Sequence, residues 1–397
     1  MAYLNRPYAL VSLFLSAWLL GGVVPARAAD TYEINAIFSL TGDHAYIGAN
    51  QLVALRALEA YVNKTGGIGG RPVSFVAGDD QSNPRVAVQL AQILISKRVP
   101  IILGAGLPAS CAAITPLVVQ SGPVLYCVTN SGQTIPGSYV FSSPAAGASM
   151  LAVAVRYLRE RGWHRIAYIG ATDAGGQDAE RSLLRAAGTP ENKELQIVAR
   201  QYFGNTDLSV DAQLAVIKAA KPDAVIAWGT GTAAGTLFRG LKNSGIDVPI
   251  VTATGNLNSA FFQQYGPLLP ANLYLAGVPY YAGDMLSDAP TKAALATLIA
   301  ALAPIGAKPD NINISVWDPG LLLVDALRKL GSDATAAQLR AYLSNLSGWV
   351  GTLGPYDFRA VPQSGLGESN VIVVKWDPQR STVSGVSKFG GAPLSGK

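Results

Sequence analysis

The segment Phe38–Pro84, FSLTGDHAYIGANQLVALRALEAYVNKTGGIGGRPVSFVAGDDQSNP, contains the pattern that decides the fold. An apolar run ends at its start and predicts a β-strand, and residues 50–64 then repeat apolar side chains at the spacing of a helix. Gly66-Gly67 ends this helix, a second apolar run predicts another strand, and Asn83-Pro84 is an N-cap followed by a first-turn proline. Strands that alternate with amphipathic helices indicate a parallel sheet covered by helices on both faces.

The same alternation continues in two successive series, which are separated by the sequence SSPAAG at 142–147. The later part of the chain contains helices and two strands but no third complete series, so we expect it to complete the two earlier sheets. The predicted fold class is therefore α/β, with two doubly wound parallel-sheet lobes joined by a hinge of three chain crossings near residues 143, 279 and 350. The expected lobes are residues 30–143 plus 279–350 and residues 144–278 plus 351–397.

Three of the predicted helices start next to polar loops. Two of them are expected to begin at Asn50 and Asp178, after loops that contain glycine. Asp318-Pro319 again combines an N-capping residue with a first-turn proline, and it predicts the start of a helix that runs to Leu330.

The N-terminus has the pattern of a cleaved secretory signal. Arg6 gives a positive start, residues 8–24 form an apolar core, and Ala26-x-Ala28 fits the small-residue rule of signal peptidase. A retained membrane anchor is the alternative, but the apolar run is marginal in length for one. We therefore expect residues 1–29 to be a signal peptide and the mature chain to begin near Asp30, outside the cytoplasm.

Charge and composition exclude nucleic acid as a partner. Only 14% of the 397 residues are charged, and the formal net charge of +5 falls to +3 without Arg6 and Arg27 of the signal. The sequence contains no run of five like charges and no basic cluster interleaved with aromatic residues.

A glycine-rich turn at Gly104-x-Gly106-x-x-Ala109 fits the spacing of a dinucleotide-binding loop. Such a loop needs an acidic residue about twenty positions later to hold the ribose, but no Asp or Glu occurs between Asp80 and Glu160. We therefore expect no nucleotide cofactor. The only two histidines, His44 and His164, are not at metal-ligand spacing, so no metal is expected either. His44 lies in the first strand-to-helix loop and is expected to be a solvated loop residue, with contact to a ligand as the alternative.

The two cysteines, Cys111 and Cys127, fall at a predicted helix start and at the end of the next strand. Both positions lie at one edge of a parallel sheet, so a disulfide is plausible in an oxidising compartment. Two small buried apolar side chains are the alternative. A nucleophilic Cys111 paired with His44 would make the protein a secreted enzyme, but no third group orients such a pair and we expect no enzyme.

Polar, glycine-containing loops follow the predicted strands of both series. Strand ends and helix N-termini meet at one edge of each sheet, where open α/β sheets bind ligands and where free N–H groups favour anions. Two such edges that face each other across three crossings predict a ligand cleft with a hinge.

The segment Phe38–Pro84 resembles the opening of a known family, and RGWHRIAYIGATDAGGQD at 161–178 resembles the start of its second lobe. This family comprises the Leu/Ile/Val-binding-protein-like solute-binding proteins of bacterial ABC importers, which have the type I periplasmic binding fold. The resemblance implies a monomer in the periplasm that binds a small molecule without a cofactor and delivers it to ABC permease subunits. A sensory ectodomain of the same fold is a second possibility.

The resemblance also implies site residues. In the family a serine and backbone amides after the third strand hold the ligand carboxylate, and the serine position is Pro108 here, while Thr129 and Tyr46 match a polar contact and a pocket wall. The glutamate that holds an α-ammonium in amino-acid binders is replaced by Asn256, and the usual tyrosine after Asp173 is replaced by small residues. We therefore expect a small carboxylate or amide as the ligand, with a branched-chain or other amino acid as the alternative. The expected ligand-binding residues are Tyr46, Leu107, Pro108, Ala109, Ser110, Val128, Thr129, Asp173, Thr230 and Asn256.

Three aromatic residues lie near the predicted crossings: Tyr280, Tyr281 and Trp317. They either line the cleft or pack at the hinge, and packing is the simpler interpretation.

Overall fold

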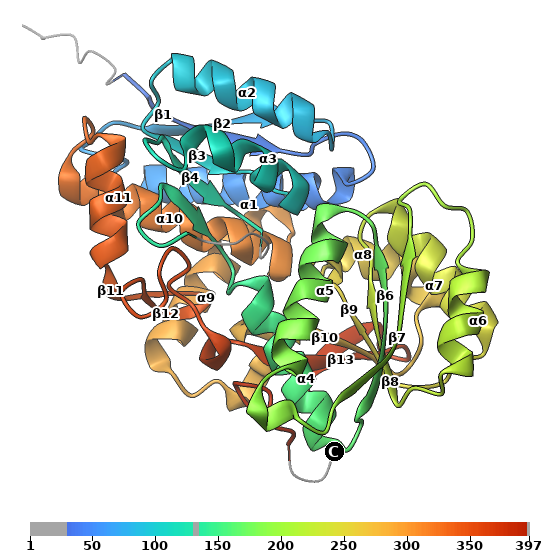
Figure 1. Cartoon of the computed structure of the whole chain (residues 1–397). Helices are drawn as coiled ribbons and strands as arrows, with labels where there is room; N and C mark the ends of the chain where they lie inside the picture. The colour runs from blue at the N-terminus through green and yellow to red at the C-terminus, as the bar shows by residue number, and fades with distance from the viewer. Residues whose placement is uncertain (1–29, 130–134, 395–397) are drawn as a thin grey trace, which may run out of the picture.

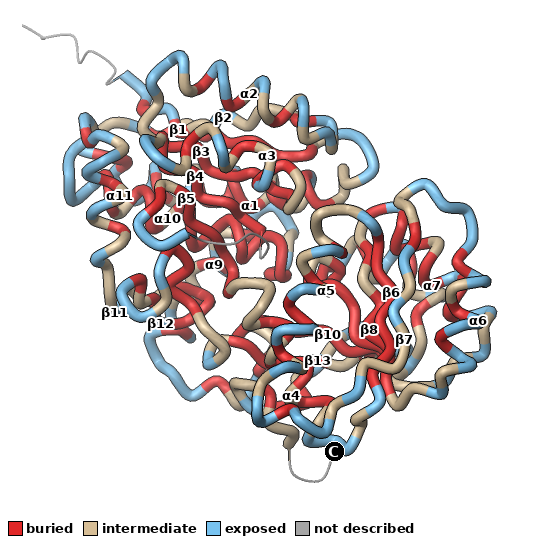
Figure 2. The backbone as a smooth tube through the Cα atoms, in the orientation of Figure 1, coloured by how far each residue is buried: buried red, intermediate tan, exposed pale blue. Residues whose placement is uncertain are grey.

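Two α/β lobes lie side by side in the structure, a computed structural model (Figure 1). It describes residues 30–129 and 135–394, so the expected signal peptide at 1–29 lies outside the described residues. Each lobe has a buried interior that follows its sheet (Figure 2). Within the described ranges, no helix is long and apolar enough to cross a membrane.

The first sheet has the strand order β2-β1-β3-β4-β5, and all its neighbouring strands pair in parallel. Helices α1 and α10 cover one face, and α2 and α3 cover the other. The alternation of side chains along the strands explains both layers: Ile37 packs with α2 and α3, whereas its neighbour Phe38 belongs to the core cluster that includes α1. The strands and helices of this sheet are β1 (Tyr32–Phe38), α1 (Ala45–Lys64), β2 (Val73–Asp79), α2 (Pro84–Ser96), β3 (Ile101–Gly104), α3 (Pro108–Val118), β4 (Val124–Cys127), β5 (Val140–Ser142) and α10 (Asn311–Leu330).

The second sheet has the order β14-β13-β10-β9-β8-β6-β7. Its first five strands in the chain, β6 to β10, run parallel, and the last two, β13 and β14, join one edge antiparallel. The elements of this sheet are α4 (Gly147–Glu160), β6 (Arg165–Ala171), α5 (Ala174–Ala187), β7 (Gln196–Phe203), α6 (Asp211–Ala219), β8 (Ala224–Trp228), α7 (Thr232–Ser244), β9 (Ile250–Thr252), α8 (Ser259–Tyr265), β10 (Leu273–Gly277), β13 (Ile372–Asp377) and β14 (Thr382–Gly385). The α/β fold predicted from the sequence is confirmed, with sheets of parallel strands covered by helices.

The chain passes between the two sheets after β5, after β10 and again before β13. The hairpin of β11 (Ser347–Gly351) and β12 (Gly354–Asp357) packs on α9 (Ala289–Leu302), beyond the expected third crossing near 350. Gln363 still accepts a hydrogen bond from the Ser142 N–H of β5 at 2.9 Å, whereas Glu368 pairs with Arg156 of α4 at 2.6 Å. These contacts favour a third crossing at 366–371, so we propose that lobe 1 extends to about residue 366.

The prediction that a helix starts at Asp318-Pro319 is wrong, because helix α10 begins earlier, at Asn311. Its N-cap is Asp310, whose carboxylate accepts the N–H groups of Ile312 at 3.0 Å and Asn313 at 2.9 Å. Asp318 lies inside the helix, fully buried, and accepts hydrogen bonds from the backbone and hydroxyl of Thr352 in the β11–β12 turn. The Asp-Pro pair thus anchors the hairpin instead of starting a helix. The remaining helix, α11 (Ala336–Asn345), has a capping box at Thr335.

Helices α1 and α5 also begin earlier than predicted, at Ala45 and Ala174 instead of Asn50 and Asp178. A glycine in the first turn of each helix packs directly on the preceding strand end. A Cβ atom at Gly48 would overlap with the Ser39 carbonyl, and one at Gly176 with the Ala171 carbonyl. These glycines allow close approach of backbone to backbone, although in the sequence they resemble loop residues.

The capping residue Asp310 makes the stability of the fold depend on pH. Burial raises the pKa of Asp310 from 3.8 to about 6, although the N–H groups of Asn313 and Ile312 act in the opposite direction. Because the pKa in the unfolded chain is lower, the folded protein binds more protons between these two values, and the free energy of unfolding contributed by Asp310 falls as the pH rises through this window.

We expect Asp310→Asn, which keeps an N-cap acceptor, to remove this dependence. Measured by urea denaturation, the free energy of unfolding of the variant relative to the wild type should rise by about 2 kcal/mol from about pH 4.5 to about pH 6.5. Parallel pH profiles of the two proteins would contradict the assignment.

Candidate ligand-binding site

A cavity of about 270 Å³ lies between the carboxyl edges of the two sheets. The loops after β1 to β4 and the start of α10 form one wall, and the loops after β6 to β9 form the other. In the first sheet β1 lies between β2 and β3, and in the second β6 lies between β7 and β8, so the strand order reverses beside these loops in both sheets. Ligands of open α/β sheets bind at such reversal points.

Eight of the ten sequence-predicted site residues line this cavity. On the first sheet, four consecutive residues start helix α3 and two follow strand β4. On the second sheet, one residue follows β6 and one follows β8. These lining residues are Leu107, Pro108, Ala109, Ser110, Val128, Thr129, Asp173 and Thr230.

The other two predicted residues, Tyr46 and Asn256, lie outside the lining. The Tyr46 hydroxyl accepts a hydrogen bond from the Gly231 N–H at 3.2 Å, across the gap between the two sheets. Burial raises the pKa of Tyr46, so this hydroxyl stays protonated. Asn256 is fully buried behind the wall, where its Nδ2 donates to the Gly229 carbonyl at 2.9 Å. Tyr46 therefore joins the two sides of the cleft, and Asn256 supports the β8 loop.

The start of helix α3 presents backbone donors to the cavity. Leu107 is its N-cap and Pro108 its first residue, so the N–H groups of Ala109 and Ser110 have no partner within the helix. The Ser110 hydroxyl is buried and donates its single proton to Asp80 at 2.6 Å. The polar groups that this turn can offer to the cavity are therefore backbone amides, which favour a carbonyl or carboxylate oxygen.

The loop after β1 places His44 in the wall of the cavity, so the expectation of a solvated His44 is wrong. Its Nε2 lies 3.3 Å from the Thr230 hydroxyl of the opposite sheet. Burial lowers the pKa of His44, although the charges of Asp173, Asp43 and Asp80 raise it. The His44 imidazole is therefore neutral and contacts the second sheet.

Asp173 is the N-cap of α5 at the opposite wall. Its Oδ1 accepts the Gly176 N–H at 2.9 Å, and its Oδ2 accepts the Asn205 Nδ2 at 3.2 Å. Gly175, two residues after Asp173, also lines the cavity. A Cβ atom at Gly175 would lie 3.7 Å from the Pro108 ring across the cleft. Asp173 is the only acidic side chain among the described lining residues, which include no Lys or Arg.

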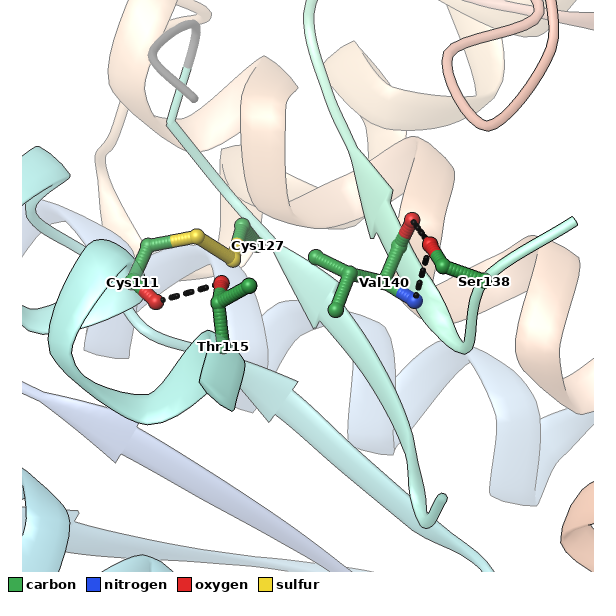
Figure 3. The surroundings of a disulfide bond; sticks show 5 residues. All are labelled: Cys111, Thr115, Cys127, Ser138 and Val140. Atoms are coloured by element: carbon green, nitrogen blue, oxygen red, sulfur yellow. Dashed lines mark hydrogen bonds between the residues drawn. A yellow bond between two sulfur atoms is a disulfide. The ribbon is translucent and has the colours of Figure 1, made fainter. Parts of the chain in front are cut away.

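A disulfide joins Cys111 of α3 to Cys127 of β4, with a Cα–Cα distance of 6.0 Å (Figure 3). Of the two alternatives, the structure has the disulfide. Because the chain contains only these two cysteines, a thiol nucleophile at Cys111 is absent from this structure. Among the residues of the described ranges, no cluster of metal-ligating side chains occurs.

The three aromatic residues near the crossings do not line the cavity. Tyr280 and Tyr281 border a separate groove at the hinge, together with Trp376. Trp317 is 1% exposed and packs on Tyr61 of α1, with ring centroids 5.4 Å apart. All three therefore pack at the hinge or in the core.

The match to a known family covers most of the chain. A family model described as periplasmic binding protein matches residues 31–382. The chain belongs to this family. A leucine-, isoleucine-, valine-, threonine-, and alanine-binding protein of Pseudomonas aeruginosa is 24% identical over 254 residues, which cover 63% of this chain and 67% of that protein.

Two solved periplasmic binding proteins have a similar fold. LivJ, a branched-chain amino acid transporter substrate-binding protein from Streptococcus pneumoniae in complex with isoleucine, is 18% identical with a TM-score of 0.76 and covers 90% of this chain and 99% of its own. A solute-binding protein of an ABC transporter from R. palustris, in complex with benzoate, is 18% identical with a TM-score of 0.74 and covers 92% of this chain and 98% of its own. The resemblance to type I periplasmic binding proteins is confirmed, and at these identities the likeness concerns the fold.

Three amide side chains of the wall were missed by the sequence analysis: Gln51, Asn205 and Asn311. Gln51 has a signal in the sequence, because it interrupts the apolar stripe of α1 between Ile47 and Leu55 and is buried with them. Asn311 was hidden by the misplaced start of α10, and Asn205 follows an edge strand with no periodic pattern around it.

Proposed function

We propose that this periplasmic binding protein is the extracytoplasmic component of an ABC importer, located in the periplasm. It acts as a monomer, encloses a small carboxylate or amide between its two lobes, and delivers it unchanged to permease subunits in the inner membrane. The observation that carries this proposal is the cavity of about 270 Å³ whose walls come from the carboxyl edges of both sheets.

Contacts from both sheets to one ligand would favour a closed form over an open one, because a ligand shifts a conformational equilibrium only through differential contacts. The benzoate complex of the R. palustris protein supports a small acid as the ligand class. Binding of a branched-chain amino acid is the second candidate, and it is supported by the relatives from Pseudomonas and Streptococcus. Against it, Asn256 offers no charge to an ammonium group and lies outside the cavity lining.

A thermal-shift panel of small acids, amides and amino acids tests this function. A true ligand at about a hundred times its Kd should add about 2.7 kcal/mol to the free energy of unfolding. Recovery of the ligand unchanged by chromatography is expected after incubation. No stabilisation by any member of the panel would contradict the proposal, and tight binding of leucine, isoleucine and valine alone would favour the second candidate.

The variant Gly175→Tyr ties the binding to the cavity. Its side chain would fill the space opposite Pro108, so we expect at least about tenfold weaker binding of whichever ligand the panel identifies. Gly188→Tyr is the matched control, since Gly188 is exposed at the other end of the same helix α5. Equal loss of affinity in both variants would show an effect on the fold instead of the cavity.

A further inference from the structure

Trp228 is the last residue of strand β8, and its side chain lines the cavity. The four strand residues before it are buried, whereas Trp228 is half-buried. One part of the side chain packs against the main apolar core, and the remaining surface borders the cavity. The indole is the largest side chain of the described cavity wall, so it presents a broad apolar surface to a ligand in the cavity.

The other tryptophans that the structure describes all pack on aromatic rings of the chain. These pairs are Trp163 with Tyr157, Trp317 with Tyr61, Trp349 with Tyr356 and Trp376 with Phe262. Among the described residues, Trp228 has no such ring partner. Paired aromatic rings gain energy beyond the burial of their area, so the indole of Trp228 leaves this interaction to a ring that a ligand brings.

Three apolar residues of the opposite wall also line the cavity: Ile47, Leu107 and Ile312. They come from the first turn of α1, the N-cap of α3 and the first turn of α10. They form a cluster of their own, separate from the two larger apolar clusters of the described residues. Because these three side chains belong to neither large core, the surface that they share is that of the cavity. The cavity therefore has apolar surface on both of its walls.

The size and the charge of the cavity narrow the ligand further. An engineered apolar cavity of about 150 Å³ holds one benzene ring, so the cavity of about 270 Å³ has room for a ring together with a head group. The described lining includes no Lys or Arg, but it includes the hydroxyls of Thr129 and Thr230 and the N–H groups at the start of α3. These polar groups serve the head group, whether it is an acid or an amide. A branched aliphatic body would fill the same space, but it cannot stack on the indole.

We propose that the ligand carries an aromatic ring that packs on the indole of Trp228, between it and the side chains of Ile47, Leu107 and Ile312. This inference rests on the proposed function and narrows its ligand class to aromatic acids and amides. It makes Trp228 a residue that determines specificity, through the choice between an aromatic and a saturated body.

Pairs of aromatic and saturated compounds of nearly equal size test the inference by titration calorimetry on the wild-type protein. The probes are benzoate with cyclohexanecarboxylate, phenylacetate with cyclohexylacetate, and benzamide with cyclohexanecarboxamide. In each pair that binds, the aromatic member should bind at least about threefold more tightly, although the saturated ring is the more apolar of the two. Equal or tighter binding of the saturated member, or tighter binding of leucine than of every aromatic probe, overturns the inference but leaves solute binding intact. Failure of all probes and of leucine to bind contradicts the proposed function together with the inference.

Two substitutions of Trp228 locate the recognition. Trp228→Leu removes the ring, and it should reduce the ratio of saturated Kd to aromatic Kd to about one, whereas Trp228→Phe retains a ring and should keep this ratio above about two. Trp349→Leu is the matched control, because Trp349 is also half-buried but lies in strand β11, outside the cavity lining. An unchanged ratio in Trp228→Leu, or an equal fall in Trp349→Leu, overturns the assignment of Trp228. If Trp228→Leu does not fold, the paired titrations on the wild type decide the question.

Discussion

Replacing Asp80 by alanine is expected to lower the free energy of unfolding by about 3–5 kcal/mol. Asp80 is fully buried, and its carboxylate accepts the hydroxyls of Ser39 and Ser110 at 2.6 Å each and the Ser82 N–H at 2.9 Å. These three donors come from the ends of β1 and β2 and from the start of α3. Alanine would leave the two buried hydroxyls and the half-buried Ser82 N–H without their acceptor, and each unpaired buried donor costs about 1–3 kcal/mol. Urea denaturation of the two proteins measures the difference.

The neighbouring residue Asp79 provides a matched control. Its carboxylate also accepts several hydrogen bonds, from the N–H groups of Leu40 and Gln81 and from the hydroxyl of Thr41. Most of these bonds lie in contact with solvent, so water can replace the carboxylate in Asp79→Ala, and the loss should stay below about 1 kcal/mol. Equal effects of the two substitutions would mean that burial of Asp80 is not the cause.

The α/β architecture was predictable because burial of both faces of a parallel sheet imposes long-range periodicity on the chain. Apolar runs and amphipathic helices therefore showed the order of strands and helices from Tyr32 to Gly277 without any contact information. Errors arose where a local signal had two physical meanings. Asp318-Pro319 has the composition of a helix start, but a buried carboxylate can also serve as an acceptor for another segment, and only the β11–β12 turn distinguishes the two.

The site was partly predictable for a similar reason. Lining residues such as Thr230 follow the strands directly, so the rule for carboxyl edges indicated their loops, and the resemblance to the family indicated the individual residues. The roles of Tyr46 and Asn256 depend instead on side-chain direction. The Tyr46 side chain reaches across the cleft, whereas the Asn256 side chain lies behind the wall. Strand order does not determine either direction.

Several contacts connect the two sheets beside the cavity. The loop after β1 reaches the loop after β8 through His44 with Thr230, at 3.3 Å, and through Tyr46 with the Gly231 N–H, at 3.2 Å. Asn311 at the start of α10 reaches the loop after β9. Residues around the cavity thus also connect the two lobes.

Loss of the Cys111–Cys127 disulfide is expected to lower the free energy of unfolding by about 3 kcal/mol. The bond closes a loop with a sequence separation of 16 between the first turn of α3 and the end of β4. In the chain-entropy account, a loop of this length removes about 3 kcal/mol of conformational freedom from the unfolded chain. Both sulfurs are buried, so reduction also leaves two thiols in a packed core.

Urea denaturation of the reduced and the oxidised wild type, and of the variant Cys111→Ala/Cys127→Ala, separates the effect of the bond on the unfolded chain from the effect of two buried thiols. Reductant should lower the free energy of unfolding of the wild type and leave that of the double variant unchanged. The double variant is the control for effects of the reductant other than cleavage of the disulfide. The start of α3 and the end of β4 both border the cavity through Ser110 and Val128, so the bond also holds the backbone amides of one wall against the next strand. We therefore expect weaker ligand binding after reduction, with a loss of affinity smaller than about tenfold because the helix and strand remain packed. A wild type whose urea midpoint does not respond to reductant would contradict the stabilising role of the bond.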